Sequence, residues 1–111
     1  MIITKSTPYT KDEIKQLTEE FDSYIKTVID IKKKICSAGC NRHFESEEAL
    51  LTKGCKQEDV WGGGVDLDTK AIDYNSFINI RSKKNESNEI IDSEKRKLYD
   101  DLTRYFFKEV L

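Results

Sequence analysis

One histidine and several carboxylates near the middle of the chain have types and spacing that suit metal chemistry. His43 and Glu45 are two residues apart, so on a strand both side chains would lie on one face, about 7 Å apart along the chain. Glu47, Glu48 or Asp59 could add a third ligand, because a set of histidine and carboxylates suits zinc, manganese or non-haem iron. The competing interpretation is an ordinary surface histidine among solvated acids. A divalent metal is therefore the one candidate cofactor.

A second group of polar side chains suits the binding of an anion. Asn79 and Arg81 share a face of an expected strand, and Asn85 and Ser87 follow in the next loop. A guanidinium, an amide and a hydroxyl together suit a phosphate or a carboxylate, and Trp61 would supply a stacking wall. The structural alternative is that Arg81 pairs with a surface acid, Asn79 satisfies a strand end, and Trp61 packs in the core.

The cysteines Cys36, Cys40 and Cys55 form no redox or zinc motif. The chain has no C-x₂-C pair, and His43 is its only histidine. The first residues become polar too quickly for a signal peptide, and no run approaches the roughly 18 apolar residues of a membrane span. We therefore expect a cytoplasmic protein without membrane association, whose three cysteines are reduced thiols.

The charge balance argues against a nucleic-acid function. The chain has 19 Lys and Arg against 21 Asp and Glu, a net charge of −2, whereas nucleic-acid binders usually carry a basic excess. Such a function would depend strongly on salt, and a solvated face is the simpler interpretation of these basic residues. The lysines that would carry it are Lys32, Lys33, Lys34, Lys83 and Lys84.

The two ends of the chain have clear signals for the elements that position these residues. Residues 2–5 are typical of a short strand, and Thr10 with Glu13 forms a capping box that begins a helix, with Tyr9 and Ile14 as its staple. The apolar face of this helix is Ile14, Leu17 and Phe21. Asp92 or Ser93 caps the last helix. Its expected apolar face is Leu98, Leu102, Tyr105, Phe106 and Val110, which leaves Tyr99 and Phe107 for a partner or dimer surface.

The middle of the chain is harder to assign. Residues 26–37 fit a continuing helix by a 3-4-3-4 spacing and a strand by a period of two, so periodicity alone leaves both open. Short strands are expected at residues 42–45, 49–52, 57–65 and 75–81. The glycines at 62–64 suggest a bulge or a close backbone approach within the third of these, and a polar loop follows at residues 82–89.

Two segments resemble a family of small prokaryotic proteins that is known only as a domain of unknown function. The first is Gly39 to Gly62, with its acidic pair, leucines, glycine turn and Trp-Gly; the second is Ser76-Phe77-Ile78-Asn79-Ile80-Arg81. The family's His-x-Asp is His43-x-Glu45 here, and the Arg of its Asn-Arg-Ser is Glu86. The resemblance implies no activity. It implies that the glycine step separates two strands, which favours a hairpin across residues 39–41 and a strand over residues 26–37.

These observations together predict one α+β domain over residues 1–111. We expect an antiparallel sheet of about five strands with two helices on one face, in the order β-α-β-β-β-β-α. The leading functional hypothesis is a non-enzymatic binding or interaction module, with a homodimer as one form of it, which would show exposed apolar surface and no convergent polar pocket. The alternative is a small metal- or phosphate-dependent hydrolase. It would bring His43, Glu45 and Asp59 together with Asn79 and Arg81 in one cleft.

Overall fold

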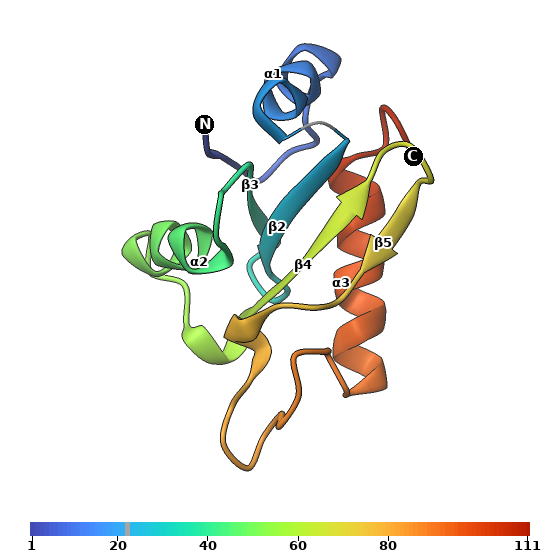
Figure 1. Ribbon diagram of the computed structural model, residues 1–111. Helices are drawn as coiled ribbons and strands as arrows, with labels where there is room; N and C mark the ends of the chain where they lie inside the picture. Colours follow the sequence, from blue (N-terminus) through green and yellow to red (C-terminus); the bar gives the residue numbers. More distant parts are fainter. Residues whose placement is uncertain (22) are drawn as a thin grey trace.

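The chain folds into a five-stranded antiparallel sheet with three α-helices (Figure 1), in a computed structural model that describes residues 1–21 and 23–111 except the side chains of Glu20 and Phe21. The strands are β1 (Ile3–Lys5), β2 (Tyr24–Asp30), β3 (Ile35–Ala38), β4 (Val60–Asp66) and β5 (Ala71–Asp73). The helices are α1 (Lys11–Phe21), α2 (His43–Thr52) and α3 (Ser93–Phe106), and two 3₁₀ turns are η1 (Gln57–Asp59) and η2 (Phe77–Asn79). The element order is β-α-β-β-α-β-β-α, which adds one helix to the expected order.

The long strands β2 and β4 form the centre of the sheet. The strand order is β1-β3-β2-β4-β5, and β2 pairs with β4 over its whole length, from Tyr24 opposite Asp66 to Asp30 opposite Val60. Residues 26–37 are therefore in strands and not in a continuing helix, but they belong to two strands, β2 and β3, where a single strand was predicted. The hairpin bends at residues 31–34, and the prediction that it lies across residues 39–41 is wrong. The Asp30 carboxylate determines this position, because Oδ1 accepts the N–H groups of Lys32 at 2.9 Å and Lys33 at 2.7 Å.

The helices cover both faces of the sheet. Ile14 of α1 and Tyr99 of α3 pack in one core with Ile25 and Ile29 of β2, whereas Leu50 of α2 packs against Val28 in a second core on the opposite face. The alternation of side chains along β2 produces this division. The expectation of two helices on one face is thus met by α1 and α3. It missed α2, which lies on the other face.

Two predicted strands form α2 instead. Residues 42–45 and 49–52 both fall in or beside this helix, and the Glu45 carboxylate accepts the N–H groups of Asn41 at 3.1 Å and Arg42 at 2.8 Å where the helix begins. Two glutamates, an alanine and two leucines follow as strong helix formers. The period of two between His43 and Glu45 therefore wrongly indicated a strand. The Glu45 side chain accepts backbone N–H groups of the residues that precede the helix, and so caps it.

A predicted strand at residues 75–81 is the 3₁₀ turn η2. The Ser76 hydroxyl accepts the N–H of Ile78 at 3.3 Å and begins this turn. The strand expected at residues 57–65 is confirmed from Val60 onward, after η1. Its three glycines form no bulge, since the pairing with β2 continues through them.

The helix starts follow the sequence signals. Thr10 N–H donates to Glu13 at 2.9 Å and Glu13 N–H donates to the Thr10 hydroxyl at 3.1 Å, and Asp92 accepts the N–H groups of Glu94 and Lys95 at the start of α3. Of the apolar positions expected in α1, Ile14 and Leu17 are buried, and the Phe21 side chain lies outside the described residues. Tyr9 packs beside Phe106 and Phe107, and its N–H donates to the Phe106 carbonyl at 2.9 Å.

The buried face of α3 is rotated from the expected one. Tyr99, Phe106 and Phe107 are fully buried, whereas Leu98 and Tyr105 are exposed. Tyr99 turns inward because its hydroxyl finds a partner in the core, 2.5 Å from the Thr27 hydroxyl. The two aromatic residues expected to form a partner surface are therefore part of the core. Among the described residues, no helix is both long and apolar enough to span a bilayer.

Gly63 provides a test of this packing. A Cβ atom at this position would lie 2.6 Å from the Tyr99 hydroxyl and would also overlap the backbone oxygen of Asp73. We expect Gly63→Ala to lower the free energy of unfolding by about 1–3 kcal/mol, since the backbone cannot move away cheaply. Urea denaturation measures the change, with Gln16→Ala, at an exposed position of α1, as the control. A Gly63→Ala protein as stable as this control would show that α3 does not pack closely on β4.

Candidate functional site

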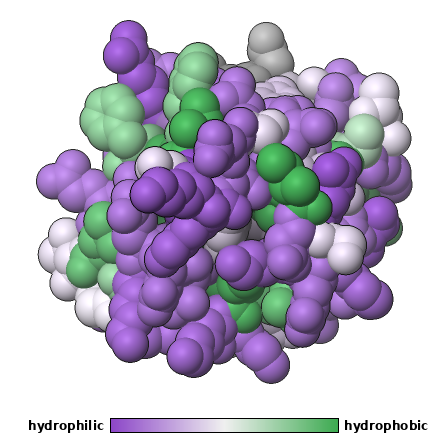
Figure 2. All heavy atoms as spheres, turned by 90° about the horizontal axis from the view of Figure 1, so that it is seen from below, coloured by the Kyte–Doolittle hydropathy of each residue, from purple (hydrophilic) through white to green (hydrophobic). Residues whose placement is uncertain are grey.

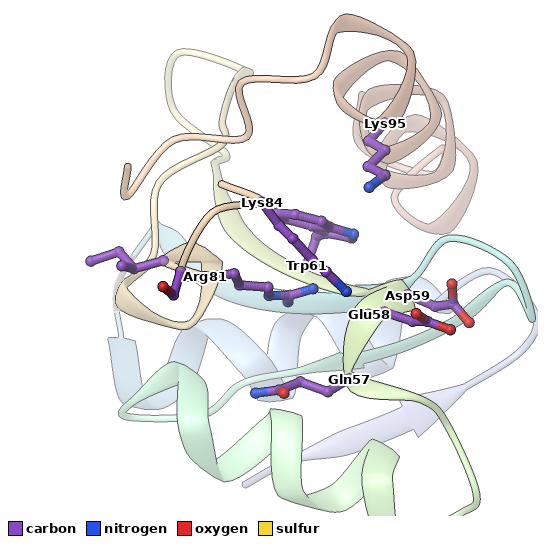
Figure 3. Close-up of a pocket in the computed structure, with 9 residues that line it drawn as sticks. Gln57, Glu58, Asp59, Trp61, Arg81, Lys84 and Lys95 are labelled. Atoms are coloured by element: carbon purple, nitrogen blue, oxygen red, sulfur yellow. The ribbon is translucent and has the colours of Figure 1, made fainter. Parts of the chain in front are cut away.

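A hollow of about 520 Å³ lies beside Trp61, and cations from separate segments line it (Figure 3). Trp61 belongs to β4, Arg81 follows η2, and Lys95 lies in the first turn of α3. Lys84 lies in a tight turn that Arg81 and Asn85 close by exchanging backbone hydrogen bonds of 2.6 and 2.8 Å. Gln57, Glu58 and Asp59 of η1 form another wall of this Trp61 hollow.

The indole of Trp61 lies between two cations. The Arg81 guanidinium carbon is 4.0 Å from the ring centroid and the Lys95 ammonium is 5.2 Å from it. Figure 3 shows these two side chains approaching the indole from opposite sides. Contacts of this kind stabilise by roughly 0.5–2 kcal/mol each, and more when water is excluded. With only 2% of its surface exposed, Trp61 is the packed residue that the structural alternative expected, yet it also forms the floor of the hollow.

Arg81 is held in place by backbone groups. Its Nη2 donates to the carbonyl of Val60, and its Nε donates weakly to that of Ile78 at 3.4 Å. Burial lowers the pKa of the guanidinium, and the nearby carboxylates of Glu47 and Asp59 oppose that change. An arginine remains charged under these conditions because its unperturbed pKa exceeds 12. Arg81 is thus a fixed positive charge beneath the indole.

Several groups around the Trp61 hollow lack partners within the described part of the chain. Arg81 Nη1 and Trp61 Nε1 are buried donors without an acceptor. The ion pairs of these residues include none made by Arg81, Lys84 or Lys95, so no carboxylate lies within 4.0 Å of these cations. A buried polar group without a partner costs about 1–3 kcal/mol. The hollow therefore combines unused donors with cations that form no ion pair within the described residues, although Glu58 and Asp59 line another of its walls.

Asn79 lies outside the Trp61 hollow and acts as a structural clamp. Its carboxamide accepts the Gly62 N–H at 2.8 Å and donates to the Gly62 carbonyl at 2.9 Å, as a neighbouring strand would. The same nitrogen also donates to the carbonyls of Tyr74 at 3.1 Å and Asn88 at 2.9 Å. Asn79 therefore has the structural role that was the alternative to ligand binding, although it satisfies a strand edge and not a strand end.

Asn85 and Ser87 also serve the backbone. The Asn85 amide donates to the carbonyls of Asn79, Ser87 and Glu89, and its oxygen accepts the N–H of Ile91 at 3.1 Å. The Ser87 hydroxyl accepts the N–H of Glu89 at 3.1 Å. Both residues order the polar segment before α3, and neither lines the Trp61 hollow.

His43 lies apart from that hollow. It is the first residue of α2, and its Nε2 is 2.6 Å from the carbonyl oxygen of Gly63. Burial, with the nearby Lys26 ammonium, lowers the pKa of His43, although the hydrogen bond to Gly63 and the charge of Asp73 oppose this. His43 lines a second hollow, and the exposed Glu45 caps α2.

The proposed set of histidine and carboxylates is therefore divided. Asp59 lines the Trp61 hollow with Arg81, whereas His43 lies on the other hollow and Glu45 is engaged at the helix start. The described residues contain no group of three metal-ligating side chains. The expectation from the sequence that Trp61 lies beside Arg81 agrees with the structure.

Lysines from two places complete the Trp61 hollow. Lys84 was considered only as part of a basic surface, and Lys95 was not singled out at all. The cap at Asp92 could have indicated that Lys95 falls in the first turn of α3, but not that this turn faces Trp61. The other basic run occupies the β2–β3 turn, where Lys33 Nζ donates to the Gly54 carbonyl at 2.9 Å.

The three cysteines are free and buried. Burial raises the pKa of Cys36 to about 12 and that of Cys55 to about 11, and it also raises the pKa of Cys40. A thiol reacts as its thiolate, and a raised pKa keeps the thiolate fraction low at neutral pH. We therefore assign the three cysteines to the core and not to a reactive site.

Substitution of Asn79 tests the clamp. Asn79→Ala leaves the two backbone groups of Gly62 and two further carbonyls without their partner, so we expect unfolding to become easier by about 3 kcal/mol. Asn88→Ala is the matched control, because that side chain is exposed and makes no hydrogen bond in the described structure. If both variants have the same urea midpoint, Asn79 does not hold the edge of β4.

Thiol labelling tests the burial of the cysteines. At pH 7 the native protein should react with DTNB more than about a hundredfold slower than the urea-unfolded protein, because the thiolate fraction is small and the reagent must wait for opening. The unfolded protein should release signal for three thiols. A native thiol that reacts at the unfolded rate would contradict this account.

The segments that carried the family resemblance have structural roles. Trp61 forms the floor of the hollow, and the following Gly62 is hydrogen-bonded by Asn79. Arg81 donates to the Val60 carbonyl of the same strand, β4. No curated protein and no solved structure is significantly similar to the chain. One family profile, "Protein of unknown function (DUF5674)", matches residues 1–106. Because that match covers nearly the whole chain, the protein belongs to the DUF5674 family.

Proposed function

We propose that this domain is a non-enzymatic binding module that holds a small anionic ligand, such as a phosphate group, in the Trp61 hollow. The observation that carries the proposal is that Arg81, Lys84 and Lys95 line one hollow beside Trp61 and form no ion pair among the described residues. Lysine and arginine side chains are the usual partners of phosphate, through charge-assisted hydrogen bonds.

The flexible and fixed parts of the hollow have different roles in this proposal. Lys84 is exposed and Lys95 is half-buried, and both have long flexible stems, so they can close on an anion from two sides. Arg81 supplies a fixed charge below, and its unpaired Nη1 and the Trp61 Nε1 would gain an acceptor if a ligand oxygen reached them. Glu58 and Asp59 on the opposite wall would disfavour large polyanions by like-charge repulsion.

The size of the hollow supports a small ligand. About 520 Å³ falls within the range of ordinary ligand pockets. On the face that Figure 2 shows, the apolar side chains (green) form small patches that hydrophilic side chains (purple) separate from one another. A broad protein interface would need a more continuous apolar centre. A binding module therefore remains our proposal, with a polar pocket in place of the apolar surface that we expected from the sequence.

No observation favours the hydrolase alternative to the same degree. That hypothesis needs His43, Glu45 and Asp59 in one cleft with Arg81, so that a base and a metal or phosphate meet. His43 and Asp59 line different hollows, and the two hollows share no lining residue.

The single tryptophan makes the proposal directly measurable. Titration with inorganic pyrophosphate should change the emission of Trp61 saturably, because the anion displaces Lys95 from its ring. Lys84→Gln and Lys95→Gln should each weaken binding by about fivefold or more, corresponding to the loss of roughly 1 kcal/mol per charged contact.

Two controls separate specific binding from general electrostatics. Lys11→Gln removes one exposed charge on α1 and should leave the dissociation constant unchanged. Potassium chloride at matched ionic strength should produce no saturable response. If pyrophosphate also produces none, or if Lys11→Gln weakens binding as much as Lys84→Gln, the proposal is wrong.

A further inference from the structure

A second hollow, of about 440 Å³, lies between β2, the start of α2 and η2. Two of its side chains, Phe44 and Phe77, are unusually exposed for phenylalanine, at 53% and 81%. Ile78 adds a third apolar side chain, and Lys26, Arg42 and His43 supply the polar lining. The hollow shares no lining residue with the Trp61 hollow.

The state of His43 follows from its hydrogen bond. A carbonyl oxygen can only accept, so the nitrogen 2.6 Å from the Gly63 carbonyl, Nε2, must carry the proton. The lowered pKa keeps the ring neutral at pH 7, so that Nδ1 is left with a lone pair. No described group donates to Nδ1. His43 therefore brings a fixed, unused hydrogen-bond acceptor to the lining of this hollow.

The charge at this hollow is positive. Among the described residues, Lys26 and Arg42 have no carboxylate within 4.0 Å. No acid is part of the lining. Glu45 accepts backbone N–H groups at the start of α2, and Asp73 accepts the Tyr24 hydroxyl at 2.5 Å. Two cations that form no ion pair among the described residues, beside exposed aromatic rings, favour a ligand that carries an anionic group on an apolar body.

We propose that this second hollow binds a small aromatic carboxylate that also carries a hydroxyl group. The ligand ring would lie against Phe44 and Phe77 and bury apolar surface that is otherwise exposed. Its carboxylate would meet Lys26 and Arg42, and its hydroxyl would donate to His43 Nδ1. The ring, the carboxylate and the hydroxyl of the ligand thus each have a complementary group in the hollow. The site is independent of the anion site at Trp61.

Two-dimensional amide NMR of the full chain tests this directly, with para-hydroxybenzoate as the probe. Resonances of residues 41–44 and 76–78 should shift saturably, while those of residues 80–84 and 95 should not. Benzoate, which lacks the donor, should bind about fivefold more weakly, and para-hydroxybenzyl alcohol, which lacks the charge, about tenfold more weakly.

Two variants assign the contacts. Arg42→Gln, at an exposed position, should weaken para-hydroxybenzoate binding about tenfold, whereas the exposed α1 control Lys15→Gln should leave it unchanged. In His43→Phe the advantage of para-hydroxybenzoate over benzoate should disappear. If the probe causes no shifts, shifts residues 80–84 instead, or binds Arg42→Gln as tightly as the natural protein, the proposal is overturned. The pyrophosphate titration at Trp61 is unaffected by either result.

Discussion

Three consecutive residues without side chains in β4 make the rest of this structure possible. Gly62, Gly63 and Gly64 lie in the longest strand pairing of the sheet, opposite β2, and another segment closely approaches each of them. A Cβ atom on Gly62 would lie 2.8 Å from that of Ser76, and one on Gly63 would meet Tyr99. The bare backbone lets η2 cover one face of the strand and α3 the other. The positions of Arg81 and Lys95 around Trp61 follow from these two contacts.

The polar side chains around β4 and η2 fall into two groups: those that hydrogen-bond to main-chain groups and those that do not. Asn79, Asn85 and Ser87 satisfy main-chain groups that a loop-rich segment would otherwise leave unpaired. Lys84 and Lys95 have no comparable partner and line the hollow beside Trp61. The same distinction applies at the second hollow, where Glu45 caps a helix while Arg42 faces solvent. Residues without an internal role are the ones available to a ligand.

Local signals predicted some of this fold, and contacts between distant segments determined the rest. The capping box at Thr10 and the cap at Asp92 are local, and both were predicted correctly. The period of two at His43 and Glu45 was not decisive, because one carboxylate at a helix start outweighs it. Trp61 was expected beside Arg81 on residue type, in a group whose other members, Asn79, Asn85 and Ser87, do not line the hollow. Lys95 could not be, since its place beside Trp61 depends on how α3 packs across β4.

The link between Tyr9 and the end of α3 has a consequence for the order of assembly in the cell. Tyr9 lies under Phe106 and Phe107 and bonds to the Phe106 carbonyl, so the first and last segments complete one core. β1 also waits for β3 before it can pair. This core therefore stays open during synthesis until α3 and Phe107 are available to pack on Tyr9. The pairing of β2 with β4 can form earlier, because both strands precede α3 in the chain.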